Sequence, residues 1–96
     1  MFKPLDSLLN SELRLAIISL LIGLDEADFK FIKEKTNATA GNLSVQLQKL
    51  KAAKYIIIKK SFKGNYPLTS CKITPKGIKA FETYVDAIKS YIIIKK

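Results

Sequence analysis

The spacing of three leucines between residues 39 and 53 constrains the fold of this chain more than any other feature. Leu43, Leu47 and Leu50 recur at intervals of four and three residues, so they lie on one side of an α-helix. Thr39 precedes them, and threonine is a favoured N-cap because its hydroxyl accepts a hydrogen bond from a backbone N–H of the first turn. The pattern predicts a helix over 39–53 that buries one narrow stripe and exposes the rest of its surface.

Two more helices are expected before this one. Asn10 or Ser11 caps the first, which we expect to end at Gly23 because glycine commonly follows a helix C-terminus. The turn 36–39 then joins a short second helix to the helix over 39–53, which is the arrangement of a helix-turn-helix. The apolar stripe of the first helix consists of Leu13, Ile17, Leu20, Leu21 and Leu24.

The short second helix is expected to begin among acidic residues, because carboxylates near a helix N-terminus interact favourably with the helix dipole. Lysines and Glu34 take the positions that we expect to face water. The acids at its start are Asp25, Glu26 and Asp28, and the residues expected on its buried side are Phe29, Phe31 and Ile32.

A β-hairpin is expected next. Residues 55–61 are rich in β-branched and aromatic side chains, which favours a strand. Gly64 and Pro67 indicate a turn over 62–67, and residues 69–73 then form the returning strand.

The last helix is expected over 74–92, with Thr74 as N-cap and Pro75 at the first helical position, where its missing N–H has no partner to lose. Its a/d seam consists of Ile78, Phe81, Val85, Ile88 and Ile92, and a second apolar column consists of Ala80, Tyr84, Ala87 and Tyr91. One three-helix core does not obviously cover both columns, so we expect the C-terminal helix 74–96 to serve dimerisation, and either column can form the interface. The expected dimerisation residues are Phe81, Tyr84, Val85, Ile88, Tyr91 and Ile92.

Charge is distributed unevenly along the chain. The net charge is +9, and residues 35–81 contain ten lysines and no acid, whereas residues 1–34 sum to −2. Such segregation indicates a polyanionic partner. A lysine surface that serves solubility alone is the alternative, but it does not explain why acids are missing from one contiguous part of the chain.

Composition excludes several chemistries. The chain has no histidine, so Ser-His or Cys-His catalysis and histidine metal sites are impossible. Cys71 is the one cysteine, which rules out an intramolecular disulfide and fits a reducing cytoplasm, and we expect it to be a small buried apolar residue. No apolar run reaches the roughly 18 residues of a membrane span. We therefore expect a cytoplasmic single domain over 1–96 that is not an enzyme, holds no metal or other cofactor and does not associate with membranes.

The surface of helix 39–53 opposite the leucines suits a DNA groove. It is narrow, small near its N-terminus and free of acids, and bulky side chains there would hold a helix away from the base edges. Asn and Gln side chains match adenine, and valine can contact a thymine methyl. An ordinary solvated face is the alternative, and it would usually carry Glu and Lys pairs. The expected DNA-facing residues are Thr39, Gly41, Asn42, Ser44, Val45, Gln46, Lys49 and Lys51.

The hairpin adds cations near its tip. Lys59, Lys60, Lys63 and Asn65 can reach phosphates or an adjacent minor groove. Lysines also protect edge strands from pairing with other chains, and for Lys59 and Lys60 both interpretations stand equally. For Lys63, at the tip, phosphate contact is favoured.

The segments GNLSVQLQKLKAAKYI and ITPKGIKAF resemble a known family. Over about residues 8–92 the chain is similar to small winged-helix transcriptional regulators related to the multiple-antibiotic-resistance and arsenic-repressor groups. The resemblance implies a mostly α, α+β winged helix-turn-helix with a three-helix core, a β-hairpin wing and a C-terminal helix. It also implies a homodimeric regulator of double-stranded DNA, with 39–53 as recognition helix and 59–69 as wing. Gln46 stands where many relatives have His, and Lys51–Lys54 replaces an acidic stretch that ends in Gly.

The alternatives are a winged-helix module that binds protein through the same surfaces, and a basic protein that binds RNA or a membrane surface. Affinity that barely changes with salt would favour the protein-binding module. RNA readers usually display aromatic side chains for stacking, and here Phe62 and Tyr66 near the wing are the candidates. A membrane surface requires a wide apolar face opposite the basic residues, which helix 39–53 lacks.

Overall fold

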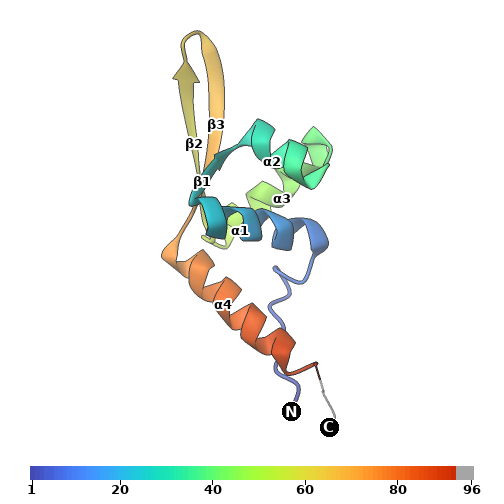
Figure 1. Cartoon of the computed structure of the whole chain (residues 1–96). Helices are drawn as coiled ribbons and strands as arrows, with labels where there is room; N and C mark the ends of the chain where they lie inside the picture. The colour runs from blue at the N-terminus through green and yellow to red at the C-terminus, as the bar shows by residue number, and fades with distance from the viewer. Residues whose placement is uncertain (93–96) are drawn as a thin grey trace.

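The computed structural model describes residues 1–92, and residues 93–96, part of the predicted C-terminal segment, lie outside the described part. Figure 1 shows α1, α2 and α3 grouped beside the base of a long hairpin. The helix α4 lies below them and runs in the direction away from the hairpin tip. This is the predicted winged-helix order of helices and hairpin, with one strand added. The elements are α1 (Glu12–Leu24), β1 (Glu26–Asp28), α2 (Phe29–Thr36), α3 (Ala40–Ala52), β2 (Ile56–Lys63), β3 (Tyr66–Ile73) and α4 (Pro75–Lys89).

The hydrophobic core lies where the three grouped helices meet the base of the sheet. Leu43, Leu47 and Leu50 are 0%, 2% and 0% exposed, which confirms the predicted buried stripe of α3. Cys71 is buried as expected, and burial raises the pKa of its thiol to about 11, so it is uncharged at neutral pH. The remaining members of the core are Leu9, Ile17, Ile18, Leu21, Ile32, Ile56, Ile73 and Tyr84.

The predicted helix N-caps are confirmed. The hydroxyl of Ser11 accepts from the Arg14 N–H at 3.5 Å, and that of Thr39 accepts from the Asn42 N–H at 3.2 Å. The hydroxyl of Thr74 does the same for the first turn of α4. Each cap satisfies an N–H group that has no partner within its helix.

The end of α1 and the start of α2 differ from the prediction. Gly23 does not end α1, which continues to Leu24 and stops where Asp25 takes a positive φ of 69° and donates its N–H to the Leu21 carbonyl. Glu26–Asp28 forms a strand rather than the first turn of a helix, and it pairs antiparallel with β3. Asp28 still caps α2, since its carboxylate accepts from the Phe31 N–H at 2.8 Å.

The sheet is antiparallel with the strand order β1-β3-β2. The register of β2 and β3 runs from Ile56 opposite Ile73 at the base to Lys63 opposite Tyr66 at the tip. The hairpin is longer than predicted, because both strands continue through the expected turn region to the two-residue loop Gly64-Asn65. Gly64 has a φ of 66°, a conformation that glycine adopts without strain.

The start of α4 closes the junction between α3 and β2. The Thr74 N–H donates to the Tyr55 carbonyl at 3.1 Å, and the Thr74 hydroxyl lies 2.7 Å from the Lys54 carbonyl oxygen. Gly77 lies in the first turn of α4, and a Cβ there would lie 2.2 Å from the Tyr55 carbonyl oxygen. The TPKG segment therefore holds α4 against the backbone that leaves α3.

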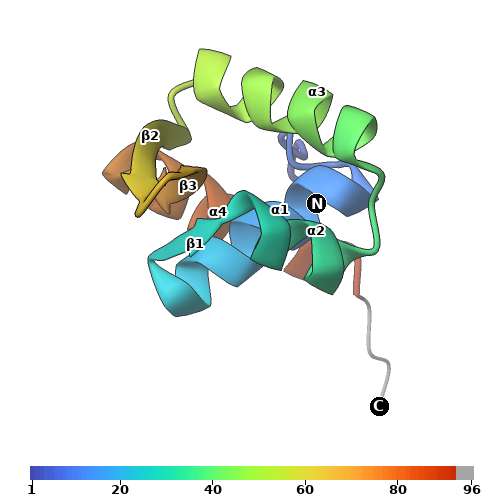
Figure 2. The same cartoon turned by 90° about the horizontal axis from the view of Figure 1, so that it is seen from above.

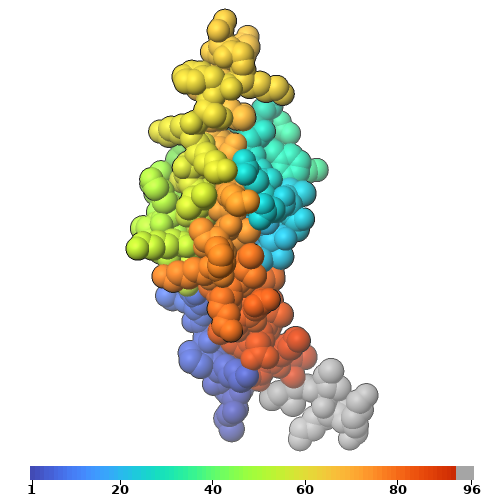
Figure 3. Space-filling view, turned by 90° about the vertical axis from the view of Figure 1, so that its left-hand side faces the viewer, coloured from blue at the N-terminus to red at the C-terminus, as the bar shows by residue number. Residues whose placement is uncertain are grey.

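The N-terminal segment fastens α4 and the α3–β2 junction. The Tyr55 hydroxyl donates to Asp6 at 2.5 Å, and the Lys3 ammonium lies 2.6 Å from Asp86 of α4. The Tyr91 hydroxyl donates to the Lys3 carbonyl at 3.0 Å. The molecule is elongated, 59 × 25 × 21 Å, with the wing at one end and the N-terminal segment and the end of α4 at the other (Figure 3).

Candidate nucleic-acid interface

The outward face of α3 is slim and open. Val45 is 51% exposed, and Gly41 is exposed with no atom within 4 Å of where a Cβ would lie. Seen from above, no other described element covers the outer side of α3 (Figure 2). Along this side lie Thr39, Asn42, Ser44, Gln48, Lys49, Lys51 and Ala52, which are all exposed. The face predicted to meet DNA is therefore accessible in the folded chain.

Gln46, predicted to face bases, lies half-buried on the side of α3 that meets α1. The Arg14 guanidinium of α1 donates to the side-chain Oε1 of Gln46, and the Gln46 Nε2 donates to the Asn42 Oδ1 at 3.0 Å. Arg14 is itself held by the Leu8 carbonyl at 2.6 Å. This chain of hydrogen bonds fixes the Asn42 carboxamide, so Gln46 positions a neighbour on the exposed face.

Sequence reasoning missed the part played by Arg14. The residue lies 32 positions before Gln46, and nothing in its local pattern identifies a partner on another helix. The sequence did offer one signal, because Arg14 is the one arginine in a chain with sixteen lysines. A guanidinium presents a rigid set of hydrogen-bond donors that lysine cannot reproduce, so a lone arginine indicates a specific contact.

The two faces of the wing carry different lysines. Lys60 lies on the face toward α3, where it lines a groove of about 300 Å³ together with Ser44 and Gln48. Lys59 points to the opposite face, where its ammonium lies 3.5 Å from the Glu26 carboxylate of β1. Lys63 and Asn65 are exposed at the tip.

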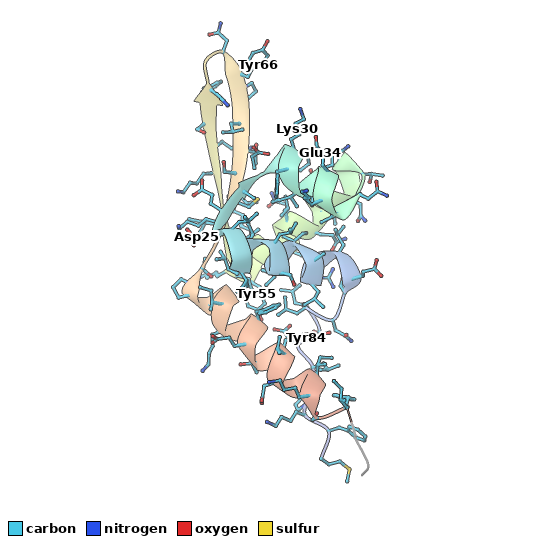
Figure 4. The ribbon with its side chains drawn as sticks, viewed as in Figure 1. Asp25, Lys30, Glu34, Tyr55, Tyr66 and Tyr84 are labelled. Atoms are coloured by element: carbon cyan, nitrogen blue, oxygen red, sulfur yellow. The ribbon has the colours of Figure 1, made fainter. Side chains whose placement is uncertain are left out.

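Acidic residues gather on the face of the sheet away from α3. Asp25 lies at the base of the wing (Figure 4), and its carboxylate is 2.5 Å from the Lys72 ammonium. The hydrogen bond to Asp25 and its negative charge raise the pKa of Lys72. Within residues 1–92, the lysines at 49, 51, 60 and 63 make no ion pair. Their positive charge is therefore not neutralised by carboxylates of the described chain.

One face of α4 is left partly uncovered. Of the two apolar columns, the one containing Tyr84 (labelled in Figure 4) and Ala87 packs on the core. The Tyr84 hydroxyl donates to the Asn10 side chain at 3.1 Å. The a/d seam lines an apolar groove of about 310 Å³ between α4 and α1, and Val85 on that seam is 38% exposed. Tyr91 stacks on Phe2 with ring centroids 4.9 Å apart. The groove residues are Leu15, Ser19, Phe81, Tyr84, Val85 and Ile88.

Within residues 1–92, four helices, a short strand and a two-stranded wing, with an open third helix beside the wing, define a winged helix of the DNA-binding type. The chain belongs to the family described as winged helix DNA-binding domain, whose model matches residues 13–92. This is a family of DNA-binding domains rather than of enzymes. Within residues 1–92, no helix is long and apolar enough to cross a membrane.

Known proteins are similar to this chain in sequence or in fold. An uncharacterized protein of Methanocaldococcus jannaschii is 42% identical over 79 residues, which are 82% of this chain and 86% of that protein. A transcriptional regulator homologue from Pyrococcus horikoshii OT3 has a TM-score of 0.82 at 24% identity, covering 88% of this chain and 83% of its own. A protein of Archaeoglobus fulgidus has a TM-score of 0.62 at 18% identity, covering 86% and 87%. The two structures agree with this chain in fold, and membership of the narrower multiple-antibiotic-resistance or arsenic-repressor groups stays a prediction.

Proposed function

We propose that the protein is a transcriptional regulator that binds specific sequences in double-stranded DNA as a homodimer. In this proposal α3 enters the major groove, and the wing, residues 59–69, contacts phosphates or the minor groove. The observation that carries it is the open, acid-free face of α3 beside lysines that no carboxylate of residues 1–92 neutralises. The name of the Pyrococcus horikoshii protein, a transcriptional regulator homologue, supports the same role.

The side chains of α3 supply the chemistry that base recognition needs. The Asn42 carboxamide is fixed by Gln46 and can hydrogen-bond to base edges, while Val45 can lie against a thymine methyl. Gly41 leaves room for the helix to approach the floor of the groove. Lys49 and Lys51 extend from the second half of α3, where they can reach bases and phosphates.

The homodimer rests on the uncovered face of α4. The seam around Val85 and Ile88 is apolar, and burial of such surface favours association by about 25 cal/mol for each Å² removed from water. A two-fold dimer would present two copies of α3 to half-sites about one helical turn apart.

A selection experiment tests the proposal. Duplexes bound at physiological salt are recovered from a random pool, and affinity for the recovered sequence is then measured as a function of salt. Four lysines per subunit, at 49, 51, 60 and 63, predict a slope of log K against log salt of about −3 to −4 per subunit, since each neutralised phosphate contributes about −0.9. Recovery of no preferred sequence would contradict specific binding, and a nearly flat salt dependence would favour the protein-binding module.

Gly41→Ala separates DNA binding from folding. No atom outside the local helix backbone lies within 4 Å of the new methyl, so we expect unchanged or slightly higher stability. We also expect affinity for the selected duplex to fall by about tenfold, because the methyl group holds α3 away from the bases. Gly23→Ala in α1 is the matched control, and it should leave affinity unchanged; equal affinities of wild type and Gly41→Ala would contradict the placement of α3.

A further inference from the structure

Two large aromatic side chains lie exposed near the tip of the wing. Phe62 is 75% exposed and Tyr66 is 79% exposed, and Figure 4 shows Tyr66 projecting from the tip. Single exposed apolar residues are ordinary on protein surfaces. Here, however, both occur on a hairpin that extends beyond the helices, and no acid lies between residues 35 and 81. Folding gains little from these rings, so a contact with a partner is the better explanation for them.

The register of the hairpin places the two rings on opposite faces. Phe62 pairs with Pro67, and Lys63 pairs with Tyr66, and directly opposed residues of antiparallel strands share a face. Phe62 lies two residues beyond Lys60, which lines the groove shared with α3. Phe62 and Pro67 therefore form an apolar pair on the face that looks toward α3, whereas Tyr66 is on the other face.

The reach of the wing suits the groove next to the one that α3 would enter. Phe62 lies four residues beyond Ile58, the last residue of β2 that packs against the core, a distance of roughly 13 Å at about 3.3 Å per residue. Neighbouring major and minor grooves are separated by about half a helical turn, roughly 17 Å. The reach of the wing beyond the core is therefore of the same order as the separation between the two grooves.

We propose that Phe62 is an apolar wedge that enters the minor groove beside the α3 site, partly unstacks one base step and bends the duplex. Proteins that kink DNA from the minor groove use side chains such as Phe and Pro for this purpose. Lys60 and Lys63, on either side of Phe62 in sequence, supply the positive charge that holds the flanking phosphates. The easily kinked pyrimidine–purine steps are the preferred position for the wedge. The inference rests on the proposed DNA-binding function and adds a specificity that α3 does not supply.

The test compares Phe62→Ala with Tyr66→Ala and Phe62→Leu on the selected duplex. The duplex carries 2-aminopurine at the steps next to the α3 site, to report unstacking, and a donor–acceptor dye pair at its ends, to report bending. We expect wild type, Tyr66→Ala and Phe62→Leu to raise 2-aminopurine fluorescence and shorten the end-to-end distance. We expect Phe62→Ala to do neither, yet to bind within about tenfold of wild type because its phosphate-contacting lysines remain. Its thermal stability should equal that of wild type, since the ring is largely exposed.

Three outcomes would overturn the wedge. A duplex equally bent by Phe62→Ala would show that the ring does not act on the base stack, while leaving the DNA-binding function intact. If Phe62→Ala and Tyr66→Ala lost the fluorescence increase and the bending equally, both would depend on the whole tip rather than on the face toward α3. Failure of the wild-type protein to bind any duplex would reject the proposed function itself, and the wedge with it.

Discussion

At the scale of single residues, Gly77 determines how closely α4 approaches the rest of the fold. We predict that Gly77→Ala lowers the free energy of unfolding by about 1–3 kcal/mol, because the added methyl would lie 2.2 Å from the Tyr55 carbonyl oxygen and force the backbone apart. Urea unfolding of the purified protein measures the change. Gly23→Ala is the control, and it should stabilise by up to about 1 kcal/mol, since that site is open and helical. A neutral Gly77→Ala would show that α4 can shift without penalty.

Tyr55 gives stability a dependence on alkaline pH. Burial, together with the hydrogen bond to Asp6 and the charge of that carboxylate, raises the pKa of Tyr55 from 10.0 to about 12. The folded state thus favours the neutral phenol, so this stabilisation is complete below pH 10 and is lost as the pH rises toward 12. We predict that the unfolding free energy of wild type falls more steeply over this interval than that of Tyr55→Phe. Lysine titration affects both proteins, so parallel curves would contradict the contribution of Tyr55.

Residues that act within one turn of the chain were predictable, and those that act across the fold were not. Ser11, Thr39 and Thr74 cap helices through bonds to a residue three positions on, so their roles are visible in the sequence. The hydrogen bond between Gln46 and Arg14 was not predicted, because Arg14 lies on another helix. A helical wheel gives the direction of a side chain but not the neighbour that holds it.

At the scale of elements, the difference between local and long-range interactions explains why β1 was not predicted. Three residues, Glu26–Asp28, have no intrinsic preference for a strand, and they form one because β3 offers free backbone groups beside them. The sequence therefore predicted the helices and the hairpin, whose patterns are local, and missed the strand that depends on pairing. The position of Gly23 within α1 likewise shows that a favoured ending residue does not by itself end a helix.

The two faces of the wing predict different effects for neighbouring lysines. We expect Lys60→Ala to weaken binding to selected and scrambled duplexes alike, by about tenfold or less, because a phosphate contact carries no base information. For this variant the slope of log K against log salt should become less negative by about one, because one phosphate contact is lost. Lys63 shares a face with Lys59 and Tyr66, but it lies at the exposed tip and makes no ion pair within residues 1–92, so we expect Lys63→Ala to behave like Lys60→Ala.

Lys59→Ala is the matched control on the same strand. Its ammonium pairs with Glu26 on the face away from α3, so we expect DNA affinity to change little. Fluorescence anisotropy titrations at several salt concentrations measure all three variants. Equal losses for Lys59→Ala and Lys60→Ala would show that both faces of the wing meet the phosphates.

At the scale of the whole molecule, the uneven charge noted in the sequence matches an uneven distribution in space. The carboxylates of Asp25 and Glu26 neutralise lysines on one face of the sheet, and the lysines of α3 and of the wing tip lie apart from them. This arrangement was the most useful functional signal in the sequence, because it depends on long stretches of chain rather than on single contacts. The structure was needed to show that Tyr84 and Ala87 of one column of α4 are buried while the a/d seam stays only partly covered.

The exposed seam of α4 predicts the state of assembly. We expect Ile88→Glu to yield a monomer with weakened binding to the selected duplex, because a buried charge at the interface opposes association. Ile88 also packs against the core, so Val85→Glu, at a more exposed position of the same seam, guards against a loss of folding. Thr83→Glu on another face of α4 is the control. Sedimentation that finds Val85→Glu unchanged as a dimer would remove the seam from the interface.

The elongated shape of the molecule also limits the length of DNA that one homodimer can protect. The wing and the far end of α4 are separated by the long dimension of the molecule, 59 Å. Two copies joined through α4 cannot extend beyond about 120 Å, and B-form DNA rises about 3.4 Å per base pair. Nuclease protection by one such pair is thus confined to about 35 base pairs, and a longer protected stretch would mean that several pairs assemble side by side.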